Sequence, residues 1–488
     1  MNLYEYFKDR NPSDKQRRKT EKYFSSILNF FDDLTKYPIS VNNILLIGEL
    51  IEEIRKREKI TREKIIDDIE FRNIEKDYSN VVEEVKKRLR ARRYPVIAGN
   101  KGINSKFKIQ NSKLNTKCKT EYRPKFVPET IIIDPKSCND LIAKNALKYA
   151  QKENIEVIEP NESPTLDFWR DYFAESVNPI LKGKKTIFLT RSKGKFARRC
   201  PGTKKMICCN YHNFDIGSNC PFDCSYCILQ YYLNLKPIAI YTNLADLEKE
   251  LELEFKNKFL RVGPGNLTDS LGTDHITNYS SSLIKITKNH PSCLIEFKTK
   301  SDYIENILRH KKNASNIVIS WSLNTNRIIE SDELYTASLE QRLNAAKACL
   351  QNGFKLAFHF DPIVIYPGFE EEYSYVIDKL FSIFESKSQV KKLVWLSLGC
   401  FRFDPKLKDI INERFENSVL PLGEFTLHSD RKYRYYEPLR IKAFQALERK
   451  IKSYYPDCPV YLCMEDKKMW KQVLNKLPKE INNSDLLY

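Results

Sequence analysis

Apolar residues recur at helical spacing through the first part of the chain, which is 488 residues long in all. Runs with this period cover residues 23–34, 44–54 and 80–89. Residues 101–120 lose the period and are rich in Asn, Lys and Ser, which is typical of a linker or an arm. The pattern therefore predicts a helical region and a linker, with a domain boundary near residue 125.

A short β-α-β pattern follows this boundary. Residues 129–133 (ETIII) and 155–158 have the composition of strands, and residues 139–152 between them have the period of a helix. We expect a small α/β domain at residues 126–185, after a helical region with a basic segment at residues 1–125.

Short β-rich runs alternate with helical runs from about residue 210 onward. The β-rich runs are DIGSN (215–219), FLRV (259–262), CLIEF (293–297), IVISW (317–321), KLAFHF (355–360) and LVWLSL (393–398). Helices such as residues 245–255 and 339–351 separate them. Repeated β-α units predict an α/β fold with a parallel sheet or barrel, which we assign to residues 186–488 together with a C-terminal extension.

Alternate positions of these strands differ in polarity. In a barrel covered by helices, one parity faces the helices and the other faces the interior. The apolar parity is Phe214, Ile216, Leu260, Val262, Ile295, Phe297, Ile317, Ile319, Trp321, Leu356, Phe358 and Phe360. The opposite parity is Asn213, Asp215, Arg261, Glu296, Lys298, Lys300, Ser320, Ser322, Asn324, His359 and Asp361. A polar interior indicates bound ligands, or charged groups that pair with one another.

The charge of the chain is concentrated in one segment. The chain has 82 Lys and Arg against 64 Asp and Glu, a formal net charge of +18. Residues 86–125 hold 14 basic residues and one acid, Glu121, with Tyr94, Phe107 and Tyr122 among them. Basic residues interleaved with aromatic ones favour binding of DNA or RNA. A solvated linker is an equally good interpretation.

Composition also limits the cellular setting. The sequence has no apolar run of about 18 residues, the length that a membrane span needs. The start of the chain is charged where a signal peptide would be apolar. The 13 cysteines are an odd number in a chain long enough to fold without disulfides, so we interpret them as reduced thiols or metal ligands. These observations predict a cytoplasmic protein that does not bind membranes.

The strongest chemical signal is the spacing Cys-x3-Cys-x2-Cys at Cys220, Cys224 and Cys227, directly after a predicted strand. Three thiolates this close can hold three irons of a 4Fe-4S cluster and leave the fourth iron open for a small chelating ligand. That arrangement is typical of radical SAM enzymes, which use S-adenosylmethionine (SAM). The alternative is a zinc site completed by His212 or Cys209, although no second Cys-x2-Cys pair is present. A Gly263-Pro264-Gly265 turn after the FLRV strand could let backbone groups approach a ligand.

Over residues 126–477 the sequence resembles the spore photoproduct lyase family of radical SAM proteins. The similar pieces are the cluster motif with ILQYYLN, and FVPETIIID, EFKTK, ISWSLN, AFHFDPI, SLGCFRF and PVYLCMED. The resemblance implies a partial (β/α)6 barrel, reductive cleavage of SAM to a 5′-deoxyadenosyl radical, and an electron donor such as flavodoxin or ferredoxin. It also implies SAM contacts at Tyr226, Gly263, Pro264, Gly265, Thr268, Lys300 and Ser322.

Two positions depart from the family pattern. The cysteine that returns a hydrogen atom to the product radical is replaced by Asn266, and the tyrosine after the last cluster cysteine by Ile228. The resemblance therefore implies that radical formation is retained, and leaves the repair of a thymine dimer open. Cys200, Cys208 and Cys209 could supply a thiol from another direction or bind a second metal, or could simply be buried.

The sequence thus favours a radical SAM enzyme that abstracts hydrogen from a substrate, with nucleic acid as the first choice. A radical SAM enzyme acting on a protein or a metabolite is the alternative within the same class. A non-catalytic, zinc-containing nucleic-acid-binding protein is the alternative from another class. An iron–sulfur protein is brown and a zinc protein is colourless, so an absorption spectrum separates the two classes.

Overall fold

The computed structural model describes residues 51, 55, 61, 62, 126–203, 206, 207, 209, 211–233, 236–254, 260–415 and 418–475. The chain divides into two compact units, Met1–Lys113 and Leu114–Tyr488. The three helical runs predicted before residue 90, the linker at 101–120 and the boundary near 125 lie outside the described residues, apart from residue 51. None of the helices in the described part has the length and apolar character to cross a membrane.

The first sheet of the second unit is part of an α/β arrangement of strands and helices. Its strands lie in the order β2 (Glu156–Ile158), β1 (Thr130–Ile133), β3 (Thr186–Thr190), β8 (Ile238–Tyr241) and β6 (Gly217–Ser218). The β-α-β unit predicted at residues 129–158 is confirmed, because β1 pairs in parallel with β2 and α8 (Leu141–Glu153) connects them. The helices α9 (Leu166–Ala174) and α10 (Pro179–Lys184) then lead into β3.

This sheet continues past the boundary that the sequence predicted at residue 185. Strand β3 pairs in parallel with β1 and with β8, and β8 pairs with β6. Side chains such as Ile187 and Leu189 in β3 are fully buried, so the strand completes the core of the small domain. The predicted strand at 215–219 is also divided, because β5 (His212–Phe214) ends before Asp215 and β6 joins the first sheet. Gly217 permits this pairing, since a Cβ there would lie 2.3 Å from the carbonyl oxygen of Ala239.

The larger sheet is a curled half-barrel. Its order is β18 (Val460–Leu462), β14 (Leu393–Cys400), β13 (Lys355–Ile363), β11 (Ile317–Ser322), β10 (Cys293–Thr299), β9 (Leu260–Gly263), β5 and β4 (Ala197–Arg199). Neighbouring strands from β5 to β18 pair in parallel, and β4 is an antiparallel edge strand. The predicted parallel β/α architecture is confirmed.

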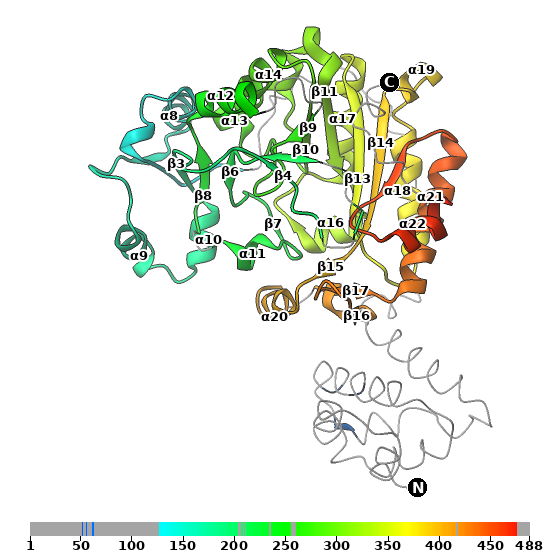
Figure 1. Ribbon diagram of the computed structural model, residues 1–488. Helices are drawn as coiled ribbons and strands as arrows, with labels where there is room; N and C mark the ends of the chain where they lie inside the picture. Colours follow the sequence, from blue (N-terminus) through cyan, green and yellow to red (C-terminus); the bar gives the residue numbers. More distant parts are fainter. Residues whose placement is uncertain are drawn as a thin grey trace, which may run out of the picture. The chain divides into compact units, whose positions relative to one another are not determined.

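Helices cover the outer face of this sheet (Figure 1). The helices of this part of the chain include α12 (Leu244–Glu254), α13 (Asp274–Thr277), α14 (Tyr279–Lys288), α15 (Glu305–Leu308), α16 (Asn326–Asp332), α17 (Leu339–Gln351), α18 (Phe369–Phe381), α19 (Lys387–Val390), α21 (Glu437–Tyr454) and α22 (Lys467–Leu474). Of these, α14 packs on β10, and α17 packs on β11 and β13. Helix α17 begins where Ser338 and Gln341 form a capping box, and its bounds match the predicted 339–351. The figure shows α18, α21 and α22 side by side next to β14.

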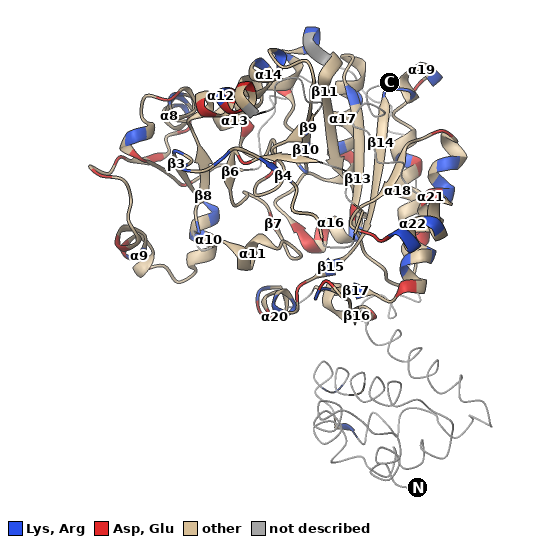
Figure 2. Cartoon of the chain, in the orientation of Figure 1, with Lys and Arg blue, Asp and Glu red and all other residues tan. Residues whose placement is uncertain are grey.

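The interior of the half-barrel has the alternation that the sequence predicted. Side chains of the apolar parity, such as Phe297, Ile319 and Phe358, are fully buried under the helices. The opposite parity buries Arg261, Glu296, Ser320 and His359 inside the sheet. Figure 2 shows Lys and Arg mixed with Asp and Glu over the described helices, as expected if the excess charge resides in residues 86–125.

Candidate functional site

The three-cysteine loop lies between β6 and the short helix α11 (Leu229–Tyr232). Within it, β7 (Asp223–Cys224) pairs in antiparallel fashion with β12 (Glu333–Leu334), so that Cys224 lies opposite Glu333. Cys224 is buried, and Cys220 and Cys227 are half-buried. The loop that carries the predicted cluster ligands is therefore held in the protein by strand pairing.

Side chains from distant parts of the second unit bind this loop. The Lys184 ammonium, at the end of α10, donates to the carbonyl oxygens of Cys220 (2.9 Å) and Phe222 (2.8 Å). On the other side, Arg414 of α20 (Pro405–Arg414) binds both carboxylate oxygens of Asp223, at 3.1 and 2.8 Å. Arg414 also contacts Gln230, which in turn donates to the carbonyl oxygen of Ser225 at 2.8 Å. These contacts fix the loop without using the cysteine sulfurs.

The residues between Cys224 and Cys227 are anchored as well. The Ser225 amide donates to the carbonyl oxygen of Asp332 at 2.8 Å, and the Ser225 hydroxyl donates to the Asp332 carboxylate. The Tyr226 hydroxyl donates to the Glu333 carboxylate. Both acids come from the junction of α16 with β12, so this junction sets the conformation of the loop.

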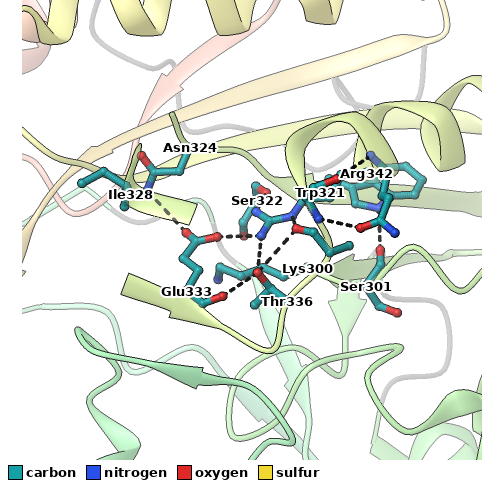
Figure 3. A network of polar contacts seen from close by, with 12 residues as sticks. Lys300, Ser301, Trp321, Ser322, Asn324, Ile328, Glu333, Thr336 and Arg342 are labelled. Carbon is teal, nitrogen blue, oxygen red and sulfur yellow. Dashed lines mark hydrogen bonds and ion pairs between the residues drawn. The ribbon is translucent and has the colours of Figure 1, made fainter. Parts of the chain in front are cut away.

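Glu333 is the centre of a buried network that Figure 3 shows. Arg342 forms an ion pair with Glu333 at 2.7 Å, and the same guanidinium donates to the carbonyl oxygen of Ser322 at 2.8 Å. The Lys300 ammonium lies 5.7 Å from the centre of the Tyr226 ring. Burial alone would raise the pKa of Glu333, but Arg342 and then Lys300 outweigh it and lower that pKa. Glu333 is therefore ionised and holds Tyr226 through a charged acceptor.

The thiols of the loop influence one another. Burial raises the pKa of Cys220 to about 12, and it raises that of Cys224 further, with smaller contributions from Cys227 and Cys220. In the described part of the chain, no three His, Cys, Asp or Glu side chains have the arrangement of a formed metal site. The assignment of Cys220, Cys224 and Cys227 as cluster ligands accordingly remains a prediction from their spacing.

The Gly263-Pro264-Gly265 turn packs against the protein. A Cβ at Gly263 would lie 2.0 Å from the Tyr211 hydroxyl and 2.2 Å from the carbonyl oxygen of Glu296. A Cβ at Gly265 would lie 3.2 Å from the Ser270 hydroxyl. At Gly263 the missing side chain thus makes room for the protein itself. Both glycines border a buried hydroxyl without a hydrogen-bond partner among the described residues, Tyr211 beside Gly263 and Ser270 beside Gly265.

The turn is joined to the cluster loop. Asp269 accepts hydrogen bonds from the Leu271 amide (2.9 Å), the Thr299 hydroxyl (2.6 Å) and the Lys300 amide (2.9 Å). A Cβ at Gly272 would lie 2.9 Å from Pro221, so the segment packs directly on the loop. Asp269 therefore joins the segment after β9 to the end of β10, and the same segment packs on the cysteine loop at Pro221.

Deeper in the half-barrel, the polar parity forms its own network. Arg261 and Glu296 form a buried ion pair at 2.7 Å, and Glu296 also binds His359 (2.6 Å) and Ser320 (2.7 Å). Burial lowers the pKa of His359 to about 4, so the imidazole is neutral and its Nε2–H donates to the carboxylate. Arg261 also lies 3.9 Å from the ring centre of Trp395. These predicted interior groups pair with one another, as one of the sequence interpretations allowed.

Other predicted interior groups divide between two places. Asp361 pairs with Arg402 at 3.2 Å, and Arg402 contacts the Cys463 sulfur at 3.8 Å. Asp215 instead lies 3.6 Å from Arg198 of the edge strand β4, because β5 ends one residue before it. Asp215 is thus not part of the interior that the alternation predicted.

The cysteines upstream of the loop are partly described. Cys200 and Cys209 are half-buried, and Cys208 lies outside the described residues. Burial, followed by Asp361, raises the pKa of Cys463 to about 12, and Cys209 contributes to this increase.

The two positions that depart from the family pattern lie on different segments. Asn266 is exposed in the segment after β9, and Ile228 is the residue before α11. Ser322 is buried at the end of β11, and Thr268 is half-buried next to Asp269. Sequence analysis did not identify five residues that anchor the loop, because none of them belongs to a motif: Lys184, Asp332, Glu333, Arg342 and Arg414.

A curled parallel sheet with a three-cysteine loop at one end of its strands is the architecture of the radical SAM enzymes, and the chain is an enzyme of this class. A family model described as spore photoproduct lyase matches residues 126–462. The chain therefore belongs to the spore photoproduct lyase family.

Curated relatives agree with this assignment. The chain is 22% identical over 351 residues to spore photoproduct lyase of Bacillus subtilis (strain 168), which covers 69% of this chain and 98% of the relative. It is 28% identical over 254 residues to spore photoproduct lyase of Geobacillus sp. (strain Y412MC61), which covers 49% of this chain and 71% of the relative.

Solved structures share the fold. A spore photoproduct lyase variant with bound AdoMet and dinucleoside spore photoproduct matches with a TM-score of 0.60 and 21% identity. The match covers 70% of this chain and 100% of that one. Spore photoproduct lyase complexed with the dinucleoside spore photoproduct also gives a TM-score of 0.60.

Proposed function

We propose that this protein binds a 4Fe-4S cluster on Cys220, Cys224 and Cys227, reductively cleaves SAM, and uses the resulting radical to abstract hydrogen from nucleic acid. When bound, the cluster and SAM supply one-electron reduction and a 5′-deoxyadenosyl radical. The observation that carries the proposal is the cluster loop, which is anchored through its carbonyls and its non-cysteine side chains. This anchoring leaves the three thiols to a metal centre.

The donor set fits the proposed cluster. Three sulfur ligands within eight residues suit iron–sulfur chemistry, and the cysteine spacing leaves one iron for a non-protein ligand. The buried, unpaired Ser270 hydroxyl beside Gly265 adds a polar group without a protein partner, as expected at the edge of a ligand site.

Lys300, Tyr226 and Ser322 support the proposed SAM contacts. The Lys300 ammonium lies 5.7 Å from the centre of the Tyr226 ring, and Arg342 donates to the carbonyl oxygen of Ser322. We propose that Tyr226 packs on the adenine, that Gly263–Gly265 lies beside the methionyl group, and that Thr268, Lys300 and Ser322 surround the rest of SAM. The role of Glu333 and Arg342 is to keep these groups in place.

Nucleic acid is the proposed substrate class. The family relatives are named for spore photoproduct, and solved relatives contain its dinucleoside form. A base inside a duplex is inaccessible to a buried radical, so the target must be flipped out or already strained. The proposed electron donor is a protein of the flavodoxin or ferredoxin type. Transfer of deuterium from a labelled oligonucleotide to 5′-deoxyadenosine tests the proposal, whereas transfer only from a protein or metabolite would contradict it.

Repair of spore photoproduct by this protein should be inefficient. A thiol returns hydrogen to a carbon radical readily because its S–H bond is weak, whereas Asn266 offers only stronger N–H and C–H bonds. With the dinucleotide photoproduct, dithionite and SAM, we expect little thymine–thymine restored per 5′-deoxyadenosine formed, and an increase with Asn266→Cys. Chromatography of both products measures this ratio.

Leu267→Cys is the matched control, because it adds a thiol one residue away. It should leave the ratio low. Many turnovers of clean repair by the unmodified protein would refute the expectation, and loss of that repair with Cys209→Ala would identify a thiol that replaces the missing one.

The basic segment at residues 86–125 is proposed to hold the phosphates. Replacing Lys113, Lys117 and Lys119 with Gln should weaken DNA or RNA binding and flatten its salt dependence. Each lost phosphate contact reduces the slope of log affinity against log salt by about 0.9 for duplex DNA or about 0.7 for single strands. Binding isotherms at several salt concentrations measure the slope.

The control for this experiment removes the same charge from the barrel-bearing unit. Lys144, Lys148 and Lys152 are exposed on α8, and their replacement with Gln should leave the slope unchanged. Equal slopes for the two triple variants would mean that the segment is only a linker.

A further inference from the structure

Lys184 is buried at the cluster loop. It is the last residue of α10, its exposed fraction is 8%, and its Nζ donates to the carbonyl oxygens on either side of Pro221. Helix α10, which leads into β3 of the first sheet, therefore contributes one cation to the cluster loop.

No carboxylate within the described residues forms an ion pair with this ammonium. The nearby acids have other partners, since Asp223 pairs with Arg414 and Asp332 binds Ser225 and Ser418. Two carbonyl dipoles do not neutralise a full charge, and a buried cation without an anion is costly. Lys184 therefore brings a positive charge to the loop, and no carboxylate of the described residues is in direct contact with it.

The positive charge of Lys184 lies beside the first cysteine of the loop. Its Nζ lies 2.9 Å from the carbonyl oxygen of Cys220, the first of the three proposed cluster ligands. Two other cations at the loop have a carboxylate partner, because Arg342 pairs with Glu333 at 2.7 Å and Arg414 pairs with Asp223 at 2.8 Å, whereas Lys300 lies beside the Tyr226 ring. Lys184 is thus placed to interact with the negative charge of a metal centre bound by the three thiols.

We propose that Lys184 compensates the negative charge of the bound cluster and raises its reduction potential. The inference rests on the proposed function. One electron from an external reductant adds one negative charge to the site, with no proton transferred, and the ammonium stabilises that charge. The electron then passes to the SAM sulfonium, where the bond between sulfur and C5′ breaks to give methionine and the radical. Lys184 acts on the cluster through its hydrogen bonds to the loop and through the electric field of its ammonium group, so it is a positioning residue.

Two replacements separate charge from hydrogen bonding. Lys184→Gln retains a donor for the loop carbonyls and removes the charge, whereas Lys184→Arg retains the charge. Lys182→Gln is the matched control on the same helix, because Lys182 donates to the Tyr172 carbonyl and does not contact the loop. The experiment uses the full chain, reconstituted anaerobically with iron and sulfide.

The measurement is the midpoint potential of the cluster, from dithionite titration followed by electron paramagnetic resonance without SAM. We expect a more negative potential for Lys184→Gln, because loss of a nearby positive charge destabilises the reduced form. Lys184→Arg and Lys182→Gln should remain close to the unmodified protein. A full cluster with an unchanged potential in Lys184→Gln would overturn the inference.

Iron and sulfide content distinguishes the remaining outcomes. If Lys184→Gln loses the cluster and Lys184→Arg retains it, the charge is again the cause and the inference holds. If both variants lose it, the loop requires lysine geometry and charge compensation is refuted. If the unmodified protein binds no iron–sulfur cluster, the proposed function fails first, and the inference fails with it.

Discussion

Replacing Cys224 with alanine is expected to abolish both iron–sulfur binding and the reductive cleavage of SAM. The residue is buried at the centre of the loop, directly opposite Glu333 in the short sheet, and alanine leaves only two thiols for the cluster. Two thiolates cannot bind the three irons that the proposed site holds through cysteine. Iron and sulfide analysis with chromatography of 5′-deoxyadenosine should show no cluster and no product above background.

The control is Cys138→Ala, in the small domain away from the loop. The Cys138 thiol donates to the carbonyl oxygen of Asp134 at 3.8 Å, four residues before it, so its loss should leave the cluster intact. Circular dichroism of both variants checks that the fold is retained. Formation of 5′-deoxyadenosine by Cys224→Ala at the normal rate would exclude this residue as a ligand.

Glu296→Ala should destabilise the half-barrel by about 3–5 kcal/mol, since it leaves the buried Arg261 guanidinium without its carboxylate. Glu296 also accepts from His359 and Ser320, and both would lose their partner. Urea unfolding of the apo protein, monitored by circular dichroism, measures the free energy of unfolding. Few other single replacements in the described strands remove so many buried contacts at once.

An exposed glutamate gives the comparison. Glu252→Ala, on the outer face of α12, should change the free energy of unfolding by less than about 0.5 kcal/mol. The paired replacement Arg261→Met with Glu296→Leu should recover part of the loss, because it removes both charges. Equal destabilisation by the single and the paired replacements would show that the uncompensated charge is not the cause.

Much of the fold followed from local patterns. The alternation of polarity in β10 and β13 predicted which side chains face inward, because a strand has a period of two residues. The helix at 339–351 was predicted with its bounds, since Ser338 and Gln341 cap it. The boundary at residue 185 stays a prediction; the sequence did not indicate that β3, which lies beyond it, pairs with β1, 56 residues earlier at Thr130. Strand pairing at that distance has no local signature.

The site was predicted only where a motif exists. Cysteine spacing indicated the cluster loop, and the resemblance indicated Lys300 and Ser322. Glu333 reaches Tyr226 from 107 residues away, and Lys184 reaches Cys220 from 36 residues away, each as a single charged residue in an ordinary polar segment. Such contacts depend on how helices return to the sheet, and the sequence carries no periodic signal for them.

Glycines near the site illustrate the same limit. The Gly-Pro-Gly turn suggested close approach of a ligand, and the position at the end of β9 was correct. At Gly263 the close neighbour is the Tyr211 hydroxyl, which comes from the segment before β5. A glycine indicates that something approaches the backbone, and only the tertiary structure identifies what it is.

The most direct test of the radical SAM assignment is one anaerobic reaction of the full chain, reconstituted with iron and sulfide, with dithionite and SAM. The account predicts a brown protein with a broad absorption band near roughly 400 nm that dithionite bleaches. It also predicts equal amounts of methionine and 5′-deoxyadenosine, formed only after reduction. A colourless protein that retains zinc at the three cysteines and forms no 5′-deoxyadenosine would contradict it.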